Sequence, residues 1–174
     1  MGQEIIGKKL KAPLAKYEFV YALPMLTISM TKGTGIVTCV PSDSPDDFVM
    51  LRDLKKKPDY YKIQPEWVEP FEPVPIIEIP GMGNMCAQVA VESRKIQGPK
   101  DKDKLKEAKD ECYLKGFTDG VMTIEGDCNG KKAEDAKIII KKMMIASGDA
   151  VPYYEPESEV ISRTGDECIC ALCD

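Results

Sequence analysis

The arrangement of this chain is decided by the stretch Gly33-Thr34-Gly35-Ile36-Val37-Thr38-Cys39-Val40-Pro41-Ser42-Asp43-Ser44-Pro45-Asp46-Asp47. The Gly-Thr-Gly segment predicts a tight turn, because glycine adopts positive φ angles without a steric penalty. The β-branched residues that follow predict a buried strand over 36–40. Pro41 is expected to end that strand, because it has no N–H group to donate to a sheet.

A helix is predicted to begin directly after this strand. Ser44 suits the N-cap position, Pro45 the first helical position, and Asp46 and Asp47 the first turn. Ser-x-x-Asp ahead of an apolar stripe is typical of a capping box. A strand-to-helix junction that carries several polar groups is a common place for a ligand pocket, so these residues are candidates for a functional site.

Composition narrows the classes of function. The 174 residues carry a net charge of −5, which argues against a protein that coats nucleic-acid backbone over a large area. The chain has no histidine, which excludes histidine-based triads and histidine metal ligands within it. No apolar run is long enough to span a bilayer, and no secretory signal is visible. We read the seven cysteines as reduced thiols and expect a cytoplasmic protein without a membrane partner.

Other segments show strand or helix patterns. Residues 25–30 alternate apolar and polar side chains and are expected to form a hairpin with 36–40. Residues 85–91 fit either a short strand or a helix. Helices are predicted over 44–57 and 131–147, and strands over 17–23, 74–79, 121–125, 151–154, 159–163 and 167–172.

The composition changes over residues 98–147, which are rich in lysine and acidic side chains. Leu105, Ala108 and Cys112 fall at helical spacing, and Gly116 is expected to follow the end of that helix. Together with the helix over 131–147, this segment predicts a helical insert that packs beside the sheet. We expect its deletion to leave the sheet folded.

Two clusters could carry chemistry. Cys168, Cys170 and Cys173 invite a metal site, but structural zinc needs four ligands, and alternate cysteines also suit one face of a strand, so no metal is expected. Asp43 and Asp47 belong to a dense group of carboxylates at the junction. Acids in the first turn of a helix stabilise it by about 0.3–1 kcal/mol each, and a carboxylate there can instead bind a ligand ammonium group.

The run 33–47 closely resembles the editing insert of cytosolic leucyl-tRNA synthetases of the eukaryotic and archaeal type. The likeness continues through 70–77, 113–117, 148–150 and 162–174, so it covers nearly the whole chain.

This resemblance implies an α+β fold, namely a β-rich, barrel-like editing domain with flanking helices, and a helical insert over 98–147. It implies post-transfer editing, the hydrolysis of mischarged aminoacyl-tRNA(Leu), with water attacking the ester. In the family the last aspartate of the motif anchors the free α-amino group of the substrate, and that residue is Asp47 here. The implied substrate-binding residues are Gly33, Thr34, Gly35, Thr38, Val40, Pro41, Asp43 and Ser44.

The sequence departs from the family in two respects. A threonine-rich Thr-x-Arg-Pro-x-Thr segment, which forms the opposite wall of the site, would precede Met1, so 1–174 is expected to be a partial editing domain. The His-x-Gly-His and Lys-Met-Ser-Lys-Ser motifs of adenylate formation are also absent from these residues. The resemblance therefore implies no cofactor in this chain, with ATP and magnesium used by a full-length enzyme.

The expected partners are the 3′ end of mischarged tRNA(Leu) and the rest of the synthetase, in a monomer. A second hypothesis is a noncatalytic module that docks a tRNA end or a partner protein through its basic helices.

Overall fold

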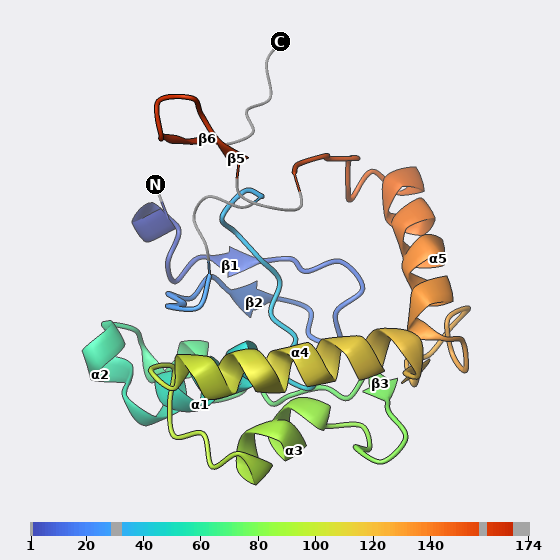
Figure 1. The fold of residues 1–174 in the computed structure, drawn as a ribbon, viewed down its shortest axis with the longest axis horizontal. Coiled ribbons are helices and arrows are strands. Elements are labelled where there is room, and N and C mark those ends of the chain that lie inside the picture. Colours follow the sequence, from blue (N-terminus) through green and yellow to red (C-terminus); the bar gives the residue numbers. More distant parts are fainter. Residues whose placement is uncertain (1, 29–32, 157–159, 169–174) are drawn as a thin grey trace.

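The computed structural model describes residues 2–28, 33–156 and 160–168 (Figure 1). Within these residues helices dominate and the strands are short. The helices are η1 (Gly2–Glu4), α1 (Pro45–Lys56), α2 (Pro58–Tyr61), η2 (Pro65–Trp67), α3 (Cys86–Ser93), α4 (Lys102–Thr118) and α5 (Ala133–Ala146). The strands are β1 (Lys9–Leu10), β2 (Val20–Tyr21), β3 (Ile77–Glu78), β4 (Val121–Met122), β5 (Val160–Ile161) and β6 (Glu167–Cys168).

Helix α1 begins as its sequence predicts. Ser44 is the N-cap, and its Oγ accepts a hydrogen bond of 3.4 Å from the backbone N–H of Asp47. Pro45 occupies the first helical position, where the missing N–H costs nothing. The side chains of Val49 and Leu54 are fully buried, so opposite sides of this helix face two different apolar clusters.

The main core lies between α1, α3 and α4, which all contact one another. In Figure 1, α4 runs beside α1 and α3, and α5 stands near its C-terminal end. Each of the three helices contributes small or branched apolar side chains that allow close approach. The buried members of this core are Val49, Ile79, Met82, Cys86, Ala90, Val91, Ile96, Leu105, Ala108 and Cys112.

The strands of the described residues form three separate two-stranded antiparallel sheets, β1–β2, β3–β4 and β5–β6. Their registers pair Lys9 with Tyr21, Ile77 with Met122, and Val160 with Cys168. Each ladder is only two residues long, so no barrel closes within this part of the chain. The expectation of a β-rich, barrel-like domain is therefore not confirmed.

The buried strand predicted over 36–40 is wrong for this structure. Residues 36–40 are irregular, and the side chains of Ile36 and Val37 are 59% and 55% exposed. β-Branched residues favour extended backbone, but a strand also needs a neighbour for its N–H and C=O groups, and no described residue pairs with this segment.

Other predicted strands survive only in part. The 17–23 strand shortens to β2, 74–79 to β3 and 121–125 to β4, and at the C-terminal end only β5 and β6 form, with no strand over 151–154. Residues 25–28 are not a strand either. The predicted hairpin turn falls on 30–33, of which 30–32 lie outside the described residues. The outer parts of the last two predicted strands, 159 and 169–172, also lie outside them.

The segment 98–147 contains the two predicted helices, and α4 packs into the main core. That deletion of the segment leaves the sheet folded stays a prediction. Leu105, Ala108 and Cys112 are buried in the main core, against α1 and α3. Gly116 lies inside α4 rather than beyond its end, because the helix continues to Thr118. The sequence fitted either a short strand or a helix over 85–91, and the structure has helix α3 at residues 86–93.

Candidate functional site

The junction before α1 is closed by backbone hydrogen bonds around Val40. The carbonyl of Val40 accepts hydrogen bonds from the N–H groups of Asp43 (3.1 Å) and Ser44 (2.8 Å). The N–H of Val40 donates to Oδ2 of Asp47 at 2.8 Å. Both polar groups of one peptide residue are thus used to fix the start of α1.

Asp47 departs from the reciprocal capping box that its spacing predicts. In a capping box the acidic side chain would accept from the N–H of the N-cap residue, Ser44. Here the carboxylate reaches past Ser44 to Val40, while the N–H of Ser44 is taken by the Val40 carbonyl. The aspartate therefore connects the preceding loop to the first helical turn.

The environment of Asp47 is unusual for a carboxylate. The residue is only 9% exposed, and burial raises its pKa above the usual range. Hydrogen bonds from Val40 and Ser44 and the positive charge of Lys109 lower the pKa, while the neighbouring Asp46 raises it further. A carboxylate in such a site gains more than an exposed one from a cationic ligand, because less water screens the pair.

Asp43 is bound differently. Ser42 Oγ donates to its Oδ2 at 2.6 Å, and the Cys86 thiol lies 3.6 Å from its Oδ1. Burial raises the pKa of Asp43, and these two hydrogen bonds oppose that rise. Ser42 is fully buried, and its carbonyl accepts from the N–H of Ala87 in α3. Asp43 therefore joins the junction to α3.

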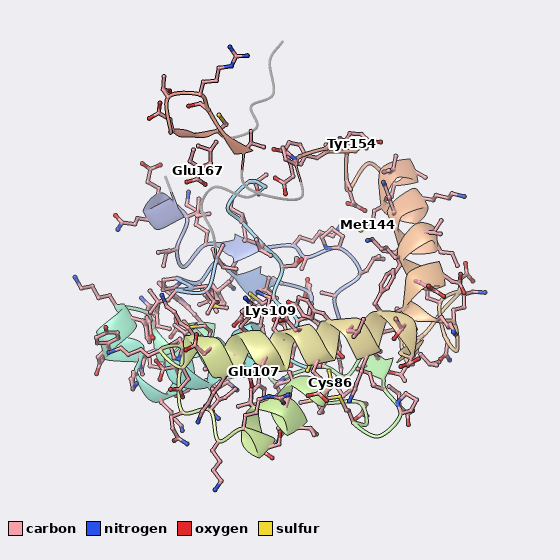
Figure 2. The ribbon with its side chains drawn as sticks, viewed as in Figure 1. Cys86, Glu107, Lys109, Met144, Tyr154 and Glu167 are labelled. Carbon is pink, nitrogen blue, oxygen red and sulfur yellow. The ribbon has the colours of Figure 1, made fainter. Side chains whose placement is uncertain are left out.

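Helix α4 supplies two residues that the sequence did not single out. Lys109 Nζ lies 2.9 Å from Oδ2 of Asp46, and the hydroxyl of Tyr113 lies 3.3 Å from Oγ of Ser44. Figure 2 shows Lys109 and Cys86 on either side of α4 in this view. Lys109 lies in a segment rich in lysine and acidic side chains, which gave no sign of its role, and the only signal for Tyr113 was its place in the resembling segment 113–117.

The structure brings together Val40, Pro41, Asp43, Ser44 and Asp47 at one junction. The other predicted substrate-binding residues form no hydrogen bond with Asp47 in the described part of the chain, namely Gly33, Thr34, Gly35 and Thr38. Gly33 instead donates its N–H to Oε2 of Glu155 at 2.8 Å. The predicted tight turn is present, with φ angles of 59° at Gly33 and 71° at Gly35.

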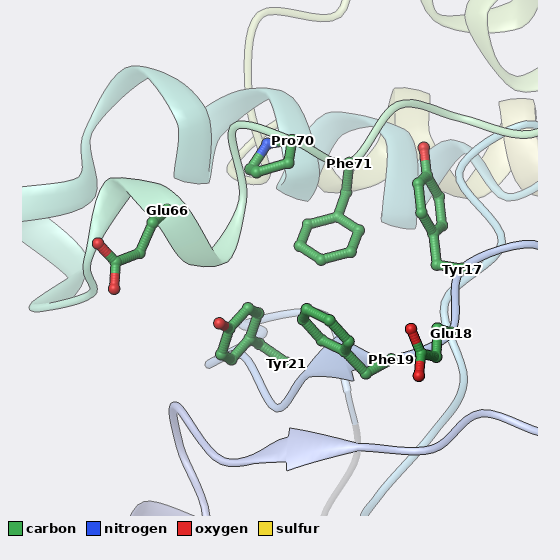
Figure 3. A pocket seen from close by; sticks show the side chains of 7 residues that line it. All are labelled: Tyr17, Glu18, Phe19, Tyr21, Glu66, Pro70 and Phe71. Carbon is green, nitrogen blue, oxygen red and sulfur yellow. The ribbon is translucent and has the colours of Figure 1, made fainter.

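Groups of metal-ligating side chains and an aromatic hollow are the other features that could form a site. Among the described residues no group of three histidine, cysteine or acidic side chains is placed to hold a metal ion. Cys168 is exposed, and Cys170 and Cys173 lie outside the described residues. A hollow of about 280 Å³ has aromatic walls and two acidic residues (Figure 3), and none of the predicted site residues lines it. Its lining residues are Tyr17, Glu18, Phe19, Tyr21, Glu66, Pro70 and Phe71.

Comparison with known proteins gives this junction a context. No family model matches the chain. The crystal structure of GlLeuRS-CP1 superposes with a TM-score of 0.80 at 36% identity, over 88% of this chain and 60% of that one. The editing domain of the P. falciparum cytosolic leucyl-tRNA synthetase gives a TM-score of 0.80 at 33% identity, over 88% of this chain and 51% of that one. Fold and junction together place the chain in the class of aminoacyl-tRNA synthetase editing domains.

The sequence relatives identify the kind of synthetase to which this editing domain belongs. The cytoplasmic leucine–tRNA ligase of Pongo abelii is 55% identical over 177 residues, which cover 100% of this chain and 15% of that protein. The chain therefore belongs to the family of cytosolic leucyl-tRNA synthetases, within their editing domain. It spans only a small part of the length of this relative. Within the described residues no helix is both long and apolar enough to cross a membrane.

Proposed function

We propose that this chain provides part of a post-transfer editing site that hydrolyses the ester bond of mischarged aminoacyl-tRNA(Leu). The observation that carries the proposal is the mostly buried carboxylate of Asp47, held at the start of α1 by the Val40 N–H. An ionised carboxylate has about four lone-pair sites, so one backbone hydrogen bond leaves accepting capacity for a ligand. The α-ammonium group of an aminoacyl ester is a small ligand of opposite charge to this carboxylate.

The proposed role of Asp47 is to hold the substrate rather than to attack it. With its ammonium group bound, the amino acid is oriented so that water can approach the ester carbonyl. Water adds to the carbonyl carbon, the bond to the ribose oxygen breaks, and the free amino acid and the ribose hydroxyl leave. Fixing the reacting groups in this way can supply several kcal/mol of the barrier reduction, and the ribose hydroxyl next to the ester can assist the water.

The remaining assignments follow from the same proposal. Gly33, Thr34, Gly35, Thr38 and Val40 would contact the terminal adenosine and the amino-acid side chain, with Pro41, Asp43 and Ser44 shaping the junction. The first four form no hydrogen bond with Asp47 among the described residues, so we propose that the substrate and the rest of the editing domain complete that wall. The hydrolysis is proposed to use no cofactor, and ATP and magnesium would serve a separate synthetic site.

The proposed partners are the 3′ end of mischarged tRNA(Leu) and the rest of a cytoplasmic, monomeric synthetase. A relative is named a cytoplasmic ligase, which supports the compartment. The matched editing domains are longer than this chain, which supports a site completed by further residues.

The proposal is tested by deacylation of isoleucyl- or norvalyl-tRNA(Leu) in the full-length synthetase. Asp47→Ala leaves the substrate ammonium unpaired, which costs about 2–5 kcal/mol. The editing rate should therefore fall by roughly thirtyfold to several thousandfold. The matched control is Asp103→Ala, which removes an exposed acid from the first turn of α4. Asp46 is not a neutral control, because it pairs with Lys109.

Equal, small losses in the two variants would leave Asp47 as a helix-capping acid and remove the proposal. A protein that binds mischarged tRNA tightly but does not deacylate it would instead support the noncatalytic docking module.

A further inference from the structure

The first turn of α1 is held from outside by helix α4. Lys109 pairs with Asp46 at 2.9 Å, and the Tyr113 hydroxyl reaches Ser44 Oγ at 3.3 Å. These two residues adjoin Asp47 at the start of α1, since Ser44 is the N-cap that accepts from the Asp47 N–H and Asp46 directly precedes Asp47. Both α4 contacts thus meet the turn that carries the proposed ammonium anchor.

The two α4 residues also contact each other. Lys109 Nζ lies 5.8 Å from the centre of the Tyr113 ring, one turn further along the helix. Behind them the helix is fixed, because Leu105, Ala108 and Cys112 are buried against α1 and α3. Lys109 and Tyr113 therefore extend toward α1 from a helix that is packed against α1 and α3.

We propose that Lys109 and Tyr113 are positioning residues of the editing site, which hold the first turn of α1, and with it the Asp47 carboxylate, in the orientation that binds the substrate ammonium. This inference rests on the proposed function. It assigns part of the site to the segment 98–147, which the sequence predicts to be a helical insert beside the sheet.

The charged groups around Asp47 predict that Lys109 also affects the pKa of this carboxylate. The carboxylate of Asp46 in α1 and the ammonium of Lys109 in α4 both act on the pKa of Asp47. The phenol of Tyr113 in α4 lies beside Lys109. In the preceding loop, burial and the negative charge of Asp47 raise the pKa of Cys39. Lys109 is the group that lowers the pKa of Asp47 by its charge, and it also compensates Asp46. Loss of this charge should raise the pKa of Asp47.

A purely structural role predicts a different result. The side chains of Lys109 and Asp46 are 40% and 17% exposed, and ion pairs that are this accessible contribute at most about 1 kcal/mol to stability. Variants of Lys109 should therefore stay folded. Any large loss of editing in them reflects the geometry and charge of the site, because small displacements of an oriented group can reduce rates strongly.

The test measures deacylation of norvalyl-tRNA(Leu) against pH in the full-length synthetase. Lys109→Met should lower kcat/KM by about tenfold and move the acidic limb of the profile to higher pH, because ionised Asp47 is needed and is harder to form. Lys109→Arg should restore both the rate and the limb. Tyr113→Phe should lower the rate without moving the limb, because it removes the hydroxyl contact and keeps the lysine charge.

The control is Lys106→Met, an exposed lysine one turn earlier in α4 without an ion-pair partner in the described part of the chain. Rates are compared at equal folded fraction, measured by thermal unfolding. If Asp47→Ala abolishes editing while Lys109→Met matches Lys106→Met in rate and pH profile, the inference is overturned and the proposed function stands. If the wild-type enzyme does not deacylate, or Asp47→Ala has no effect, the proposed function fails and the inference fails with it.

Discussion

The backbone N–H of Val40 and the carboxylate of Asp47 form a hydrogen bond of 2.8 Å that spans seven residues of the chain. It ties an irregular, exposed loop to the first turn of a buried helix. Because the donor is a backbone group, the bond does not depend on the side chain at position 40. The orientation of this aspartate is therefore set by the path of the chain through the junction, and by the helix that supports it.

Asp47 should cost the protein stability in its ionised form. Since its folded-state pKa is raised, the folded protein binds the proton more tightly than the unfolded chain, and stability falls as pH rises from the usual aspartate range through the raised pKa. Asp47→Asn keeps an oxygen that can accept from Val40 and removes the charge. We expect its melting temperature at pH 7 to equal or exceed that of the wild type, with the gain disappearing at low pH. A lower melting temperature at pH 7 would contradict this account of Asp47.

Asp53 should behave in the opposite way. Burial alone would raise its pKa, but hydrogen bonds from Lys57 (2.8 Å) and Tyr61 (2.6 Å) outweigh burial and lower it. The stability that this gives is present above the unfolded-state pKa and is lost as pH falls through the lowered folded-state pKa. Asp53→Ala should reduce the free energy of unfolding at pH 7 by about 1–3 kcal/mol.

Denaturant unfolding at several pH values measures the effect of Asp53. The difference from the wild type should shrink in acid, where Asp53 is protonated in both states. A difference that stays constant down to low pH would show that the ionised side chain is not the cause. Asp110→Ala, at an exposed position of α4, is the matched control.

Two glycines at the end of α4 should respond oppositely to alanine. A Cβ at Gly116 would lie 3.5 Å from Cδ1 of Ile79, an ordinary contact, and a glycine inside a helix costs about 0.5–1 kcal/mol relative to alanine. Gly116→Ala should therefore raise the melting temperature. A Cβ at Gly120 would lie 2.2 Å from the Gly116 carbonyl oxygen and 2.6 Å from Cγ2 of Ile77, so Gly120→Ala should lower it. Equal changes of the melting temperature in Gly116→Ala and Gly120→Ala would contradict this description of the C-terminal end of α4.

The place of α4 in the core has a direct test. Leu105 is 3% exposed, and Leu105→Ala should reduce the free energy of unfolding by about 2–5 kcal/mol, because it leaves a cavity beside α1 and α3. Leu114, on the same helix, is 67% exposed, so Leu114→Ala should change stability by less than about 0.5 kcal/mol. Chemical denaturation measures both. A small effect of Leu105→Ala would show that α4 contributes little to the stability of the core.

Local signals predicted the parts of the fold that local interactions determine. Ser44, Pro45 and Asp47 mark the start of α1 within a few residues, and the structure confirms that start. The segment 36–40 has an equally clear extended pattern, but a strand depends on a partner that the pattern cannot supply. Gly116 was expected after a helix, yet α4 continues through it to Thr118, because a glycine inside a helix costs only about 0.5–1 kcal/mol relative to alanine.

The candidate site divides in the same way. The sequence predicts that Val40, Ser44 and Asp47 lie close together, because they belong to one short stretch of the chain. Lys109 and Tyr113 lie more than sixty residues away and reach the junction only through the packing of α4. A lysine in a charged helix gives no local sign that its partner is a first-turn aspartate of another helix.

Asp47 is proposed to bind the substrate through the α-ammonium group of the amino acid. The most direct measurement compares two esters of tRNA(Leu) in the full-length enzyme, one carrying norvaline and one carrying the same acyl chain without its amino group. We expect the wild type to hydrolyse the norvalyl ester at least about thirtyfold faster, and Asp47→Ala to remove most of that preference. If Asp47→Ala slows both esters equally and keeps the preference, the ammonium is bound elsewhere and the account is contradicted.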